Sequence, residues 1–364
     1  MNTVQKIKSL RKHPLIELLK HNKGNPRTLI LMEPLWGIPY NLIAPFATLY
    51  MYTQGITDVQ IGLILSVAMF VQVFFSFFGG IITDKFGRKF TTMMGDFFGW
   101  SVACLIWAIS SNFWLFLIAV LFNSFEQINQ TAWYCLLIED ADSKDLLGIY
   151  TWVNIGGLVA IFFAPISGLL INSFNVVPVV RVLYLVFAVN MLIKVIITFR
   201  HCDETRQGKI RMAETKGTPV LQLLYEYKDL IPKVLRNKEI MKVVTVSVIL
   251  HITNLVSTNF FSLYVTQFII IYVFVAAVAS ALVVPRKDTL LQLNINPKER
   301  ARINALIMSF TIAFASPFGY FSGWLSSIDR RLPFVFTFTI FIVAIIIVGR
   351  IRDPEFANEH EEVE

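Results

Sequence analysis

The chain is dominated by apolar segments, each about 20 residues long, that alternate with short polar loops. A helix of about 20 apolar residues can cross the hydrocarbon core of a membrane, which is about 30 Å thick. Because that core holds no water, each segment must satisfy its own backbone hydrogen bonds, and an α-helix does so. The sequence therefore predicts an all-α, polytopic helical membrane protein with about ten transmembrane helices. The candidate spans are 29–52, 59–83, 91–110, 112–137, 148–171, 178–199, 240–263, 268–289, 303–326 and 333–349.

The positively charged residues are distributed unevenly over the loops. Only 16% of the residues are charged, against about 25% in a typical soluble domain. Residues 1–28 and 200–242 are rich in Lys and Arg, whereas 53–58 and 110–112 contain neither. An excess of Lys and Arg marks the cytoplasmic side of a membrane protein. We therefore predict a multi-pass protein of the cell (plasma) membrane with both termini in the cytoplasm. The Lys and Arg of these loops account for the net charge of +7, so the charge does not indicate binding to nucleic acid.

One long hydrophilic interruption, residues 201–238, divides the apolar region. The predicted organisation has five parts. They are a cytoplasmic basic N-terminus (1–28), a six-helix bundle (29–200), a cytoplasmic linker (201–238), a four-helix half (239–350) and an acidic cytoplasmic tail (351–364). Apolar residues recur at helical spacing in 221–235, which indicates a segment that lies along the membrane surface, and 4–19 could do the same. We expect both to be surface anchors rather than binding modules.

The loop between the second and third apolar segments carries glycines and charges at fixed positions. Residues 80–89 read GIITDKFGRK, which has the form G-x-x-x-D-x-x-G-R-K. Gly80 allows two helices to approach closely, and Gly87 is expected to adopt a positive φ. Asp84 is placed to face the positive N-terminal end of another helix. Arg88 offers a rigid fork for a carboxylate, and Lys89 completes the pattern. These residues predict a latch between helices.

This pattern, lying between two apolar segments, resembles the loop signature of the major facilitator superfamily. The resemblance implies a fold of two six-helix halves and transport of a small solute by alternating access. It also implies that Arg88 pairs with Glu139 or Asp140 and that Asp84 faces the start of the ninth segment, near Ala301. The predicted gating loop contains Gly80, Asp84, Gly87, Arg88, Lys89, Glu139 and Asp140.

The second half of the chain repeats the first but is shorter. The first segment ends in LYMYTQ (49–54) and the seventh in LYVTQ (263–267). After Gln54 come the second and third segments, but after Gln267 comes at once the counterpart of the fourth, so roughly 60 residues have no counterpart. We interpret this as a missing helix pair and expect a loosely packed C-terminal half. The alternative is that the repeat is coincidental and ten spans are the native number.

Polar side chains inside membrane segments usually face a cavity or a partner. In the superfamily the first, fourth and seventh helices contribute to the central cavity. The predicted substrate or proton cavity contains Asn41, Asn123, Glu126, Gln130, Trp133, His251 and Asn254. Glu126 could bind a proton, or it could be neutral or paired and support packing; His251 could be a packing residue. We expect Arg286, Lys287 and Asp288 to end the eighth segment at the interface, with a position inside the helix as the alternative.

No Ser/His/Asp set, zinc-ligand spacing or phosphate-binding G-x-x-x-x-G-K-S/T is present. We therefore expect no enzymatic activity, catalytic residue, metal or cofactor. The predicted function is secondary active transport of a small solute, with proton coupling as one option and with drug efflux and sugar-type uptake both open. The expected partners are the substrate, the lipid bilayer and, if coupled, protons, for a monomer or weak dimer that binds no nucleic acid. The alternative is a truncated, transport-inactive remnant.

Overall fold

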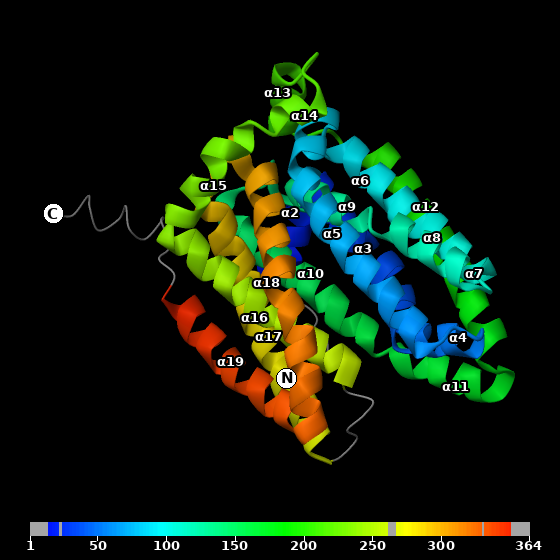
Figure 1. The fold of residues 1–364 in the computed structure, drawn as a ribbon. Helices are drawn as coiled ribbons and strands as arrows, with labels where there is room; N and C mark the ends of the chain where they lie inside the picture. Colours follow the sequence, from blue (N-terminus) through cyan, green and yellow to red (C-terminus); the bar gives the residue numbers. More distant parts are fainter. Residues whose placement is uncertain (1–13, 22–23, 261–266, 330, 351–364) are drawn as a thin grey trace, which may run out of the picture.

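The computed structural model describes residues 14–21, 24–260, 267–329 and 331–350. Within these residues the chain is entirely helical, without a strand, and most helices run side by side in a bundle (Figure 1). Six helical stretches in the described part are long and apolar enough to cross a membrane. The predicted all-α membrane fold is confirmed.

The helices that precede the linker correspond to the first six predicted segments. Several of these segments are broken: the first at Pro45 and the fifth before Pro165, where proline lacks the N–H that would continue the helix. The helices are α2 (Pro14–His21), α3 (Asn25–Ile43), η1 (Ala44–Phe46), α4 (Ala47–Thr53), α5 (Asp58–Phe86), α6 (Arg88–Asp96), the π-helical turn η2 (Phe97–Val102), α7 (Ala103–Ile109), α8 (Phe113–Asn123), α9 (Glu126–Ile138), η3 (Ser143–Asp145), α10 (Leu146–Ile161), α11 (Ala164–Phe174) and α12 (Val176–His201).

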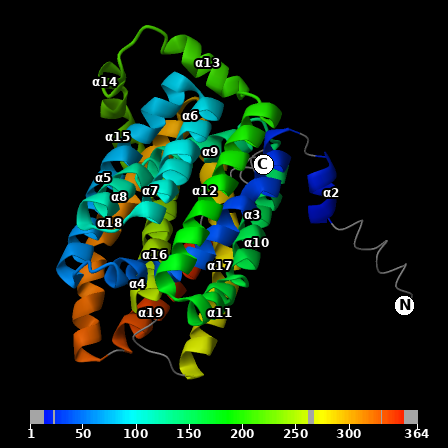
Figure 2. The same ribbon diagram turned by 90° about the vertical axis from the view of Figure 1, so that its right-hand side faces the viewer.

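The linker is helical and lies over one end of the bundle, which we call the linker end (Figures 1 and 2). It contains α13 (Arg206–Glu214), α14 (Val220–Leu223) and α15 (Glu226–Arg236). The prediction that 221–235 lies along the membrane surface is wrong. The apolar side chains of this stretch, including Leu223, Tyr227, Leu230 and Val234, are buried in a core shared with the C-terminal helices. An amphipathic pattern indicates a buried face, but not whether protein or lipid covers it.

The C-terminal helices are α16 (Lys238–Phe260), α17 (Gln267–Leu293), η5 (Pro297–Glu299), α18 (Arg300–Ile328) and α19 (Leu332–Gly349). The chain folds back between α16 and α17 as required, although the turn predicted near 264–268 lies largely outside the described residues. Arg286, Lys287 and Asp288 do not end a helix: α17 continues to Leu293. Lys287 and Asp288 are largely buried and pair with each other. Because each charge has a partner, neither side chain has to extend to the membrane–water interface.

The described side chains of the C-terminal helices include a shared buried core; the expected loose packing of this half stays a prediction. Buried side chains from α16, α17, α18 and α19 form one cluster, which the linker helices and Ile81 of α5 extend. The linker thus covers apolar surface that four helices alone would leave open.

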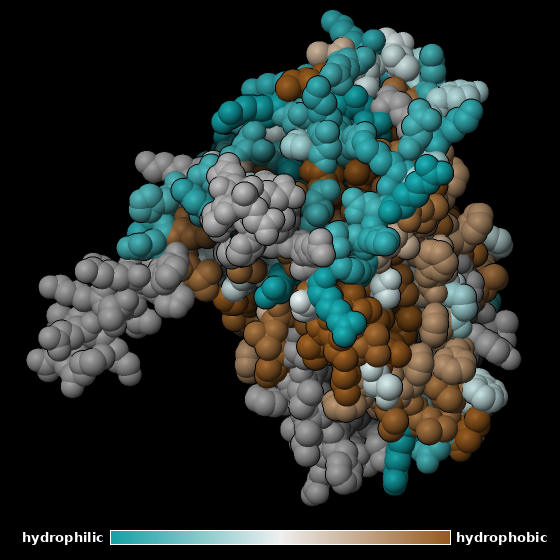
Figure 3. All heavy atoms as spheres, turned by 90° about the vertical axis from the view of Figure 1, so that its left-hand side faces the viewer, coloured by the Kyte–Doolittle hydropathy of each residue, from teal (hydrophilic) through white to brown (hydrophobic). Residues whose placement is uncertain are grey.

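The N-terminal and C-terminal helices meet along two seams. α5 packs against α18, and α10 packs against α17. Away from the linker end, large apolar side chains such as Phe162 (82% exposed) and Phe70 (76%) lie on the surface. Figure 3 shows hydrophobic residues over the middle of one face and hydrophilic residues at the linker end. Such an apolar surface is suited to lipid contact.

Candidate functional site

The loop between α5 and α6 has the backbone conformation that its glycine predicts. Gly87 ends α5 and precedes α6 with φ +87°, a region that L-residues rarely adopt. Directly after it, the N–H groups of Arg88 and Lys89 donate to the carboxylate of Glu204, at 2.9 and 3.0 Å. A carboxylate at this position satisfies two free N–H groups and interacts favourably with the helix dipole. Lys89 also lies over the ring of Phe199, 5.4 Å from its centroid.

Arg88 makes the contact that the superfamily resemblance implies. Its guanidinium donates through Nε to Glu139 Oε2 at 2.9 Å and through Nη2 to Glu139 Oε1 at 3.0 Å. Both side chains are fully buried, so the pair is shielded from water. Asp140 does not join it; its carboxylate lies 3.8 Å from the exposed side chain of Arg206.

Asp84 is the point where three parts of the chain meet. Its carboxylate forms ion pairs with Arg88 of α6 (3.1 Å), Arg211 of α13 (3.1 Å) and Arg302 of α18 (3.2 Å). Asp84 therefore does face the start of α18, next to Ala301, as expected. Its partner there is the Arg302 guanidinium rather than the helix N-terminus.

Gly80 permits the close approach of α5 to α18. A Cβ atom at this position would lie 2.6 Å from the Arg302 Cα atom and 2.8 Å from the Ala301 carbonyl oxygen. Because both obstacles are backbone atoms, a side chain at position 80 would force the two helices apart. The glycine and the Asp84–Arg302 pair thus bring the same two helices together.

Sequence reasoning missed three residues of this cluster: Glu204, Arg211 and Arg302. Glu204 and Arg211 lie in the hydrophilic linker, where charged residues usually face solvent, and only their folded position distinguishes them. Arg302 could have been found, since it is a charge at the start of an apolar segment, beside the residue that Asp84 was expected to face.

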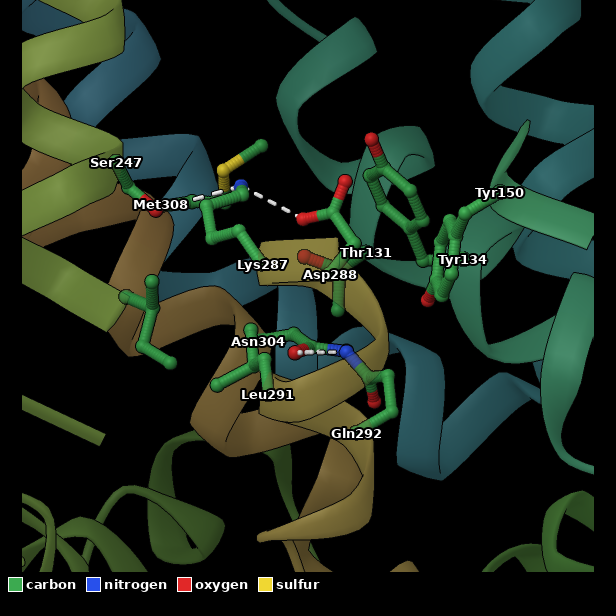
Figure 4. Close-up of a pocket in the computed structure, with 11 residues that line it drawn as sticks. Thr131, Tyr134, Tyr150, Ser247, Lys287, Asp288, Leu291, Gln292, Asn304 and Met308 are labelled. Atoms are coloured by element: carbon green, nitrogen blue, oxygen red, sulfur yellow. Dashed lines mark hydrogen bonds and ion pairs between the residues drawn. The ribbon is translucent and has the colours of Figure 1, made fainter. Parts of the chain in front are cut away.

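A small cavity lies between the N-terminal and C-terminal helices (Figure 4). It has a volume of about 70 Å³ and combines two tyrosines with polar side chains of α16, α17 and α18. Lys287 Nζ lies 2.6 Å from Asp288 Oδ1 and 3.4 Å from Ser247 Oγ, and Gln292 donates to Asn304 at 3.1 Å. Sites for drug-sized ligands have roughly 300–1,000 Å³, so this conformation has no room here for such a solute.

None of the predicted cavity residues lines this cavity. Asn41 donates to the Gly37 carbonyl within α3, and Asn123 donates to the Gly99 carbonyl in the π-helical turn. Trp133 is buried in a hydrophobic cluster. Gln130 and His251 are half-buried, and Asn254 is exposed.

Glu126 begins α9 next to Gly99, one turn from a charged pair inside the N-terminal bundle. Asp96 and Lys194 are buried, with Lys194 Nζ 3.3 Å from Asp96 Oδ2, and Asn129 donates to Asp96 Oδ1 at 2.7 Å. Within the described residues, no hydrogen bond or ion pair joins Glu126 or Glu33 to this pair, although Asn129 follows Glu126 by about one turn of α9. Among the described residues, no group of three or more His, Cys, Asp or Glu side chains is placed to hold a metal ion.

Parts of the chain are similar in sequence to known transporters. Over 152 residues, the chain is 32% identical to the uncharacterized MFS-type transporter YqjV of Bacillus subtilis (strain 168); the match covers 40% of this chain and 36% of that one. Over 171 residues it is 29% identical to the multidrug resistance protein MdtG of Rahnella sp. (strain Y9602), covering 43% and 40%. The matched region thus spans about two fifths of these relatives or less.

Solved structures show the same fold at low sequence identity. The proton:xylose symporter XylE matches with a TM-score of 0.63 at 10% identity, covering 90% of this chain and 96% of that one. The transporter FucP matches with a TM-score of 0.64 at 14% identity, covering 88% and 98%. The family model for the Major Facilitator Superfamily matches residues 35–348. The chain therefore belongs to the major facilitator superfamily and is a membrane-embedded transporter homologue.

Proposed function

We propose that the protein is a secondary active transporter that moves a small solute by alternating access, with a gate at the linker end. The observation that carries this proposal is the ion pair between Asp84 of α5 and Arg302 of α18, which joins the two groups of helices at the linker end of the α5–α18 seam. Alternating access requires contacts that can be broken and re-formed between two rigid groups of helices. Paired charges suit this role better than interlocked apolar side chains, because water can replace their hydrogen bonds.

The charge distribution supports a cytoplasmic position for the linker end. The linker carries eight Lys and Arg, more than any other segment between the spans, and such loops stay in the cytoplasm. In this orientation the Asp84 cluster closes the cytoplasmic side, and both termini are cytoplasmic. The predicted divisions at 28–29, 200–201, 238–239 and 350–351 then separate the cytoplasmic segments from the two helical groups.

Two substrate classes remain candidates: drug-like solutes and sugars. The curated relative MdtG is named a multidrug resistance protein, and the structural neighbour XylE is a xylose symporter. We favour a small organic solute that enters between the two helical groups when the small cavity of Figure 4 widens. Asn41, Gln130, Trp133, His251 and Asn254 remain candidates for contact with it in an open conformation.

Proton coupling is proposed at the charged cluster around Asp96. Lys194 pairs with Asp96, and within the described residues no cation pairs with Glu126, which lies one turn before Asn129 in α9. An ionisable side chain within a membrane segment is a candidate for a proton relay. Glu126 is the proposed carrier, because Asp96 is already neutralised by Lys194.

The alternative function is a transport-inactive remnant. It is supported by the stretch of roughly 60 residues that the second half lacks relative to the first. Inserting the corresponding helix pair of a full-length relative between Gln267 and Phe268 tests it. Uptake that appears only after this insertion would establish the remnant.

The direct test is transport by the chain itself, reconstituted in vesicles with an imposed proton gradient. A panel of dyes and labelled sugars should include at least one solute that the native chain moves and the Arg302→Gln variant does not. The Glu126→Gln variant should still exchange this solute across the membrane but lose acceleration by the gradient. If the native chain moves no solute of the panel while a full-length relative does, the transport proposal is contradicted.

A further inference from the structure

The linker makes specific contacts with the proposed gate on the N-terminal side. The Glu204 carboxylate receives the first two N–H groups of α6, and the Thr205 hydroxyl donates to Glu139 Oε2 at 2.6 Å. Arg211 donates to Asp84 Oδ2 at 3.1 Å. Lys85 donates to the carbonyl oxygen of Thr218. The linker therefore touches the same carboxylates that hold Arg88 and Arg302.

Two glycines make room for the Glu204 carboxylate. A Cβ atom on Gly87 would lie 2.5 Å from Glu204 Oε2, and one on Gly208 would lie 1.9 Å from Glu204 Oε1. Gly208 lies in α13 with an ordinary helical backbone, and its steric requirement comes from this contact and from the Thr205 hydroxyl, 2.9 Å from such a Cβ atom. Gly87, the second glycine of the loop motif, thus leaves room for the Glu204 carboxylate and also adopts the positive φ of the turn.

The other end of the linker joins the two helical groups. The Tyr227 hydroxyl of α15 donates to the Phe77 carbonyl of α5 at 2.9 Å, and the two rings stack at 4.8 Å. On its other side α15 buries Leu230 and Val234 in the C-terminal core, and Lys233 lies 2.8 Å from Glu299. A single helix thus bridges α5 to the helices that must separate from it.

We propose that residues 202–236, which we call the strap, form a third part of the gate and hold the linker end closed. This inference rests on the proposed gate, and it adds that opening requires the strap to release α5. If α18 moves away from Asp84, α15 cannot keep both the Phe77 contact and its place in the C-terminal core. Arg88 of α6 stays beside Asp84 when Arg302 and Arg211 leave, so the open state retains a counter-ion for this buried carboxylate.

The test measures opening and does not depend on transport. Met308 lines the cavity between the helical groups, and a cysteine there is reached by a membrane-impermeant maleimide only when one end opens. The experiment uses the Met308→Cys variant in inside-out vesicles, which present the proposed cytoplasmic face. The native thiols of Cys104, Cys135 and Cys202 are buried. Burial raises the pKa of the Cys202 thiol to about 11, but Cys202 lies in the strap, so the background also carries Cys202→Ser.

Three strap variants are then compared: Arg211→Gln, Gly208→Ala and Tyr227→Phe. Arg211→Gln removes the ion pairs with Asp84 and Glu214, Gly208→Ala displaces the Glu204 carboxylate, and Tyr227→Phe removes the hydrogen bond to Phe77. All three leave Asp84, Arg88 and Arg302 unchanged. Each should speed labelling at position 308, by roughly threefold to tenfold, as the closed state loses one hydrogen-bonded contact. The matched controls are Arg206→Gln, whose side chain is 90% exposed, and Tyr225→Phe, which is 76% exposed. Neither control should change the rate.

Arg302→Gln separates this inference from the proposed gate. If Arg302→Gln speeds labelling and all three strap variants label at the rate of the controls, the strap is a passive connection and the inference is overturned. If the strap variants speed labelling and Arg302→Gln does not, the strap is supported and the gate based on Asp84 and Arg302 is contradicted. Each variant is scored only when its melting temperature confirms a folded protein, and the three substitutions act on separate contacts.

Discussion

Arg302 Nε lies 3.2 Å from Asp84 Oδ2, which joins the start of α18 to the end of α5 across 218 positions of sequence. Gly80 lies one helical turn before Asp84, and a side chain on it would strike the backbone of Arg302. The ion pair and the close backbone approach therefore depend on each other. If the two helices were farther apart, the Arg302 guanidinium would reach the Asp84 carboxylate only through a more extended side chain.

The contact at Gly80 gives the first prediction. Gly80→Ala should lower the free energy of unfolding by about 1–3 kcal/mol, because the added methyl group meets backbone atoms that cannot rotate away. The measurement is thermal denaturation of the detergent-solubilised protein. Gly157→Ala is the matched control, since this glycine lies in α10 with open space around it. A stability of the Gly80→Ala variant equal to that of the control would refute the steric argument.

Arg88 should not be replaceable by lysine. Its guanidinium contacts Glu139 through Nε and Nη2 and Asp84 through Nη1, and an ammonium group cannot serve both carboxylates in this geometry. Arg88→Lys should therefore cost about 2 kcal/mol of stability. The exposed Lys144, which pairs with Asp142, provides the comparison: Lys144→Arg should be neutral. Equal melting temperatures for these two variants would show that only the charge matters at position 88.

The pair of Asp96 and Lys194 should behave as a unit. Lys194→Met leaves a buried carboxylate without its cation, and Asp96→Asn leaves a buried amine; each should cost about 3–5 kcal/mol. The double variant should recover most of this loss, because it removes both charges. Denaturation of the four proteins forms a double-mutant cycle. Additive losses would mean that the two charges do not stabilise each other.

The membrane orientation can be tested without any transport assay. A fluorescent protein that matures only in the cytoplasm should fluoresce when fused after Glu364, as the Lys and Arg bias predicts. An alkaline phosphatase inserted after Gly55, in a loop without Lys or Arg, should be active because it is exported. The reverse pattern would place the linker end outside the cell and remove the cytoplasmic gate.

The sequence by itself determined the features that depend on local pattern and composition. The apolar segments specify membrane helices, because backbone polar groups in lipid must be satisfied within the segment. The fixed spacing in residues 80–89 identified Gly80 as a close-contact site and Gly87 as a positive-φ turn. It also led, through the family resemblance, to Arg88 beside Glu139.

Only the tertiary structure decided which distant charges share a site. Asp96 and Lys194 are 98 positions apart, and nothing in their local sequence links them. Arg211 and Glu204 have the surroundings of solvated linker residues, yet folding brings them to the α5–α6 loop. Likewise, Lys287 and Asp288 stay inside a helix because they neutralise each other there. Apolar periodicity follows from each segment's own backbone, but the partner of a charge depends on how the segments pack.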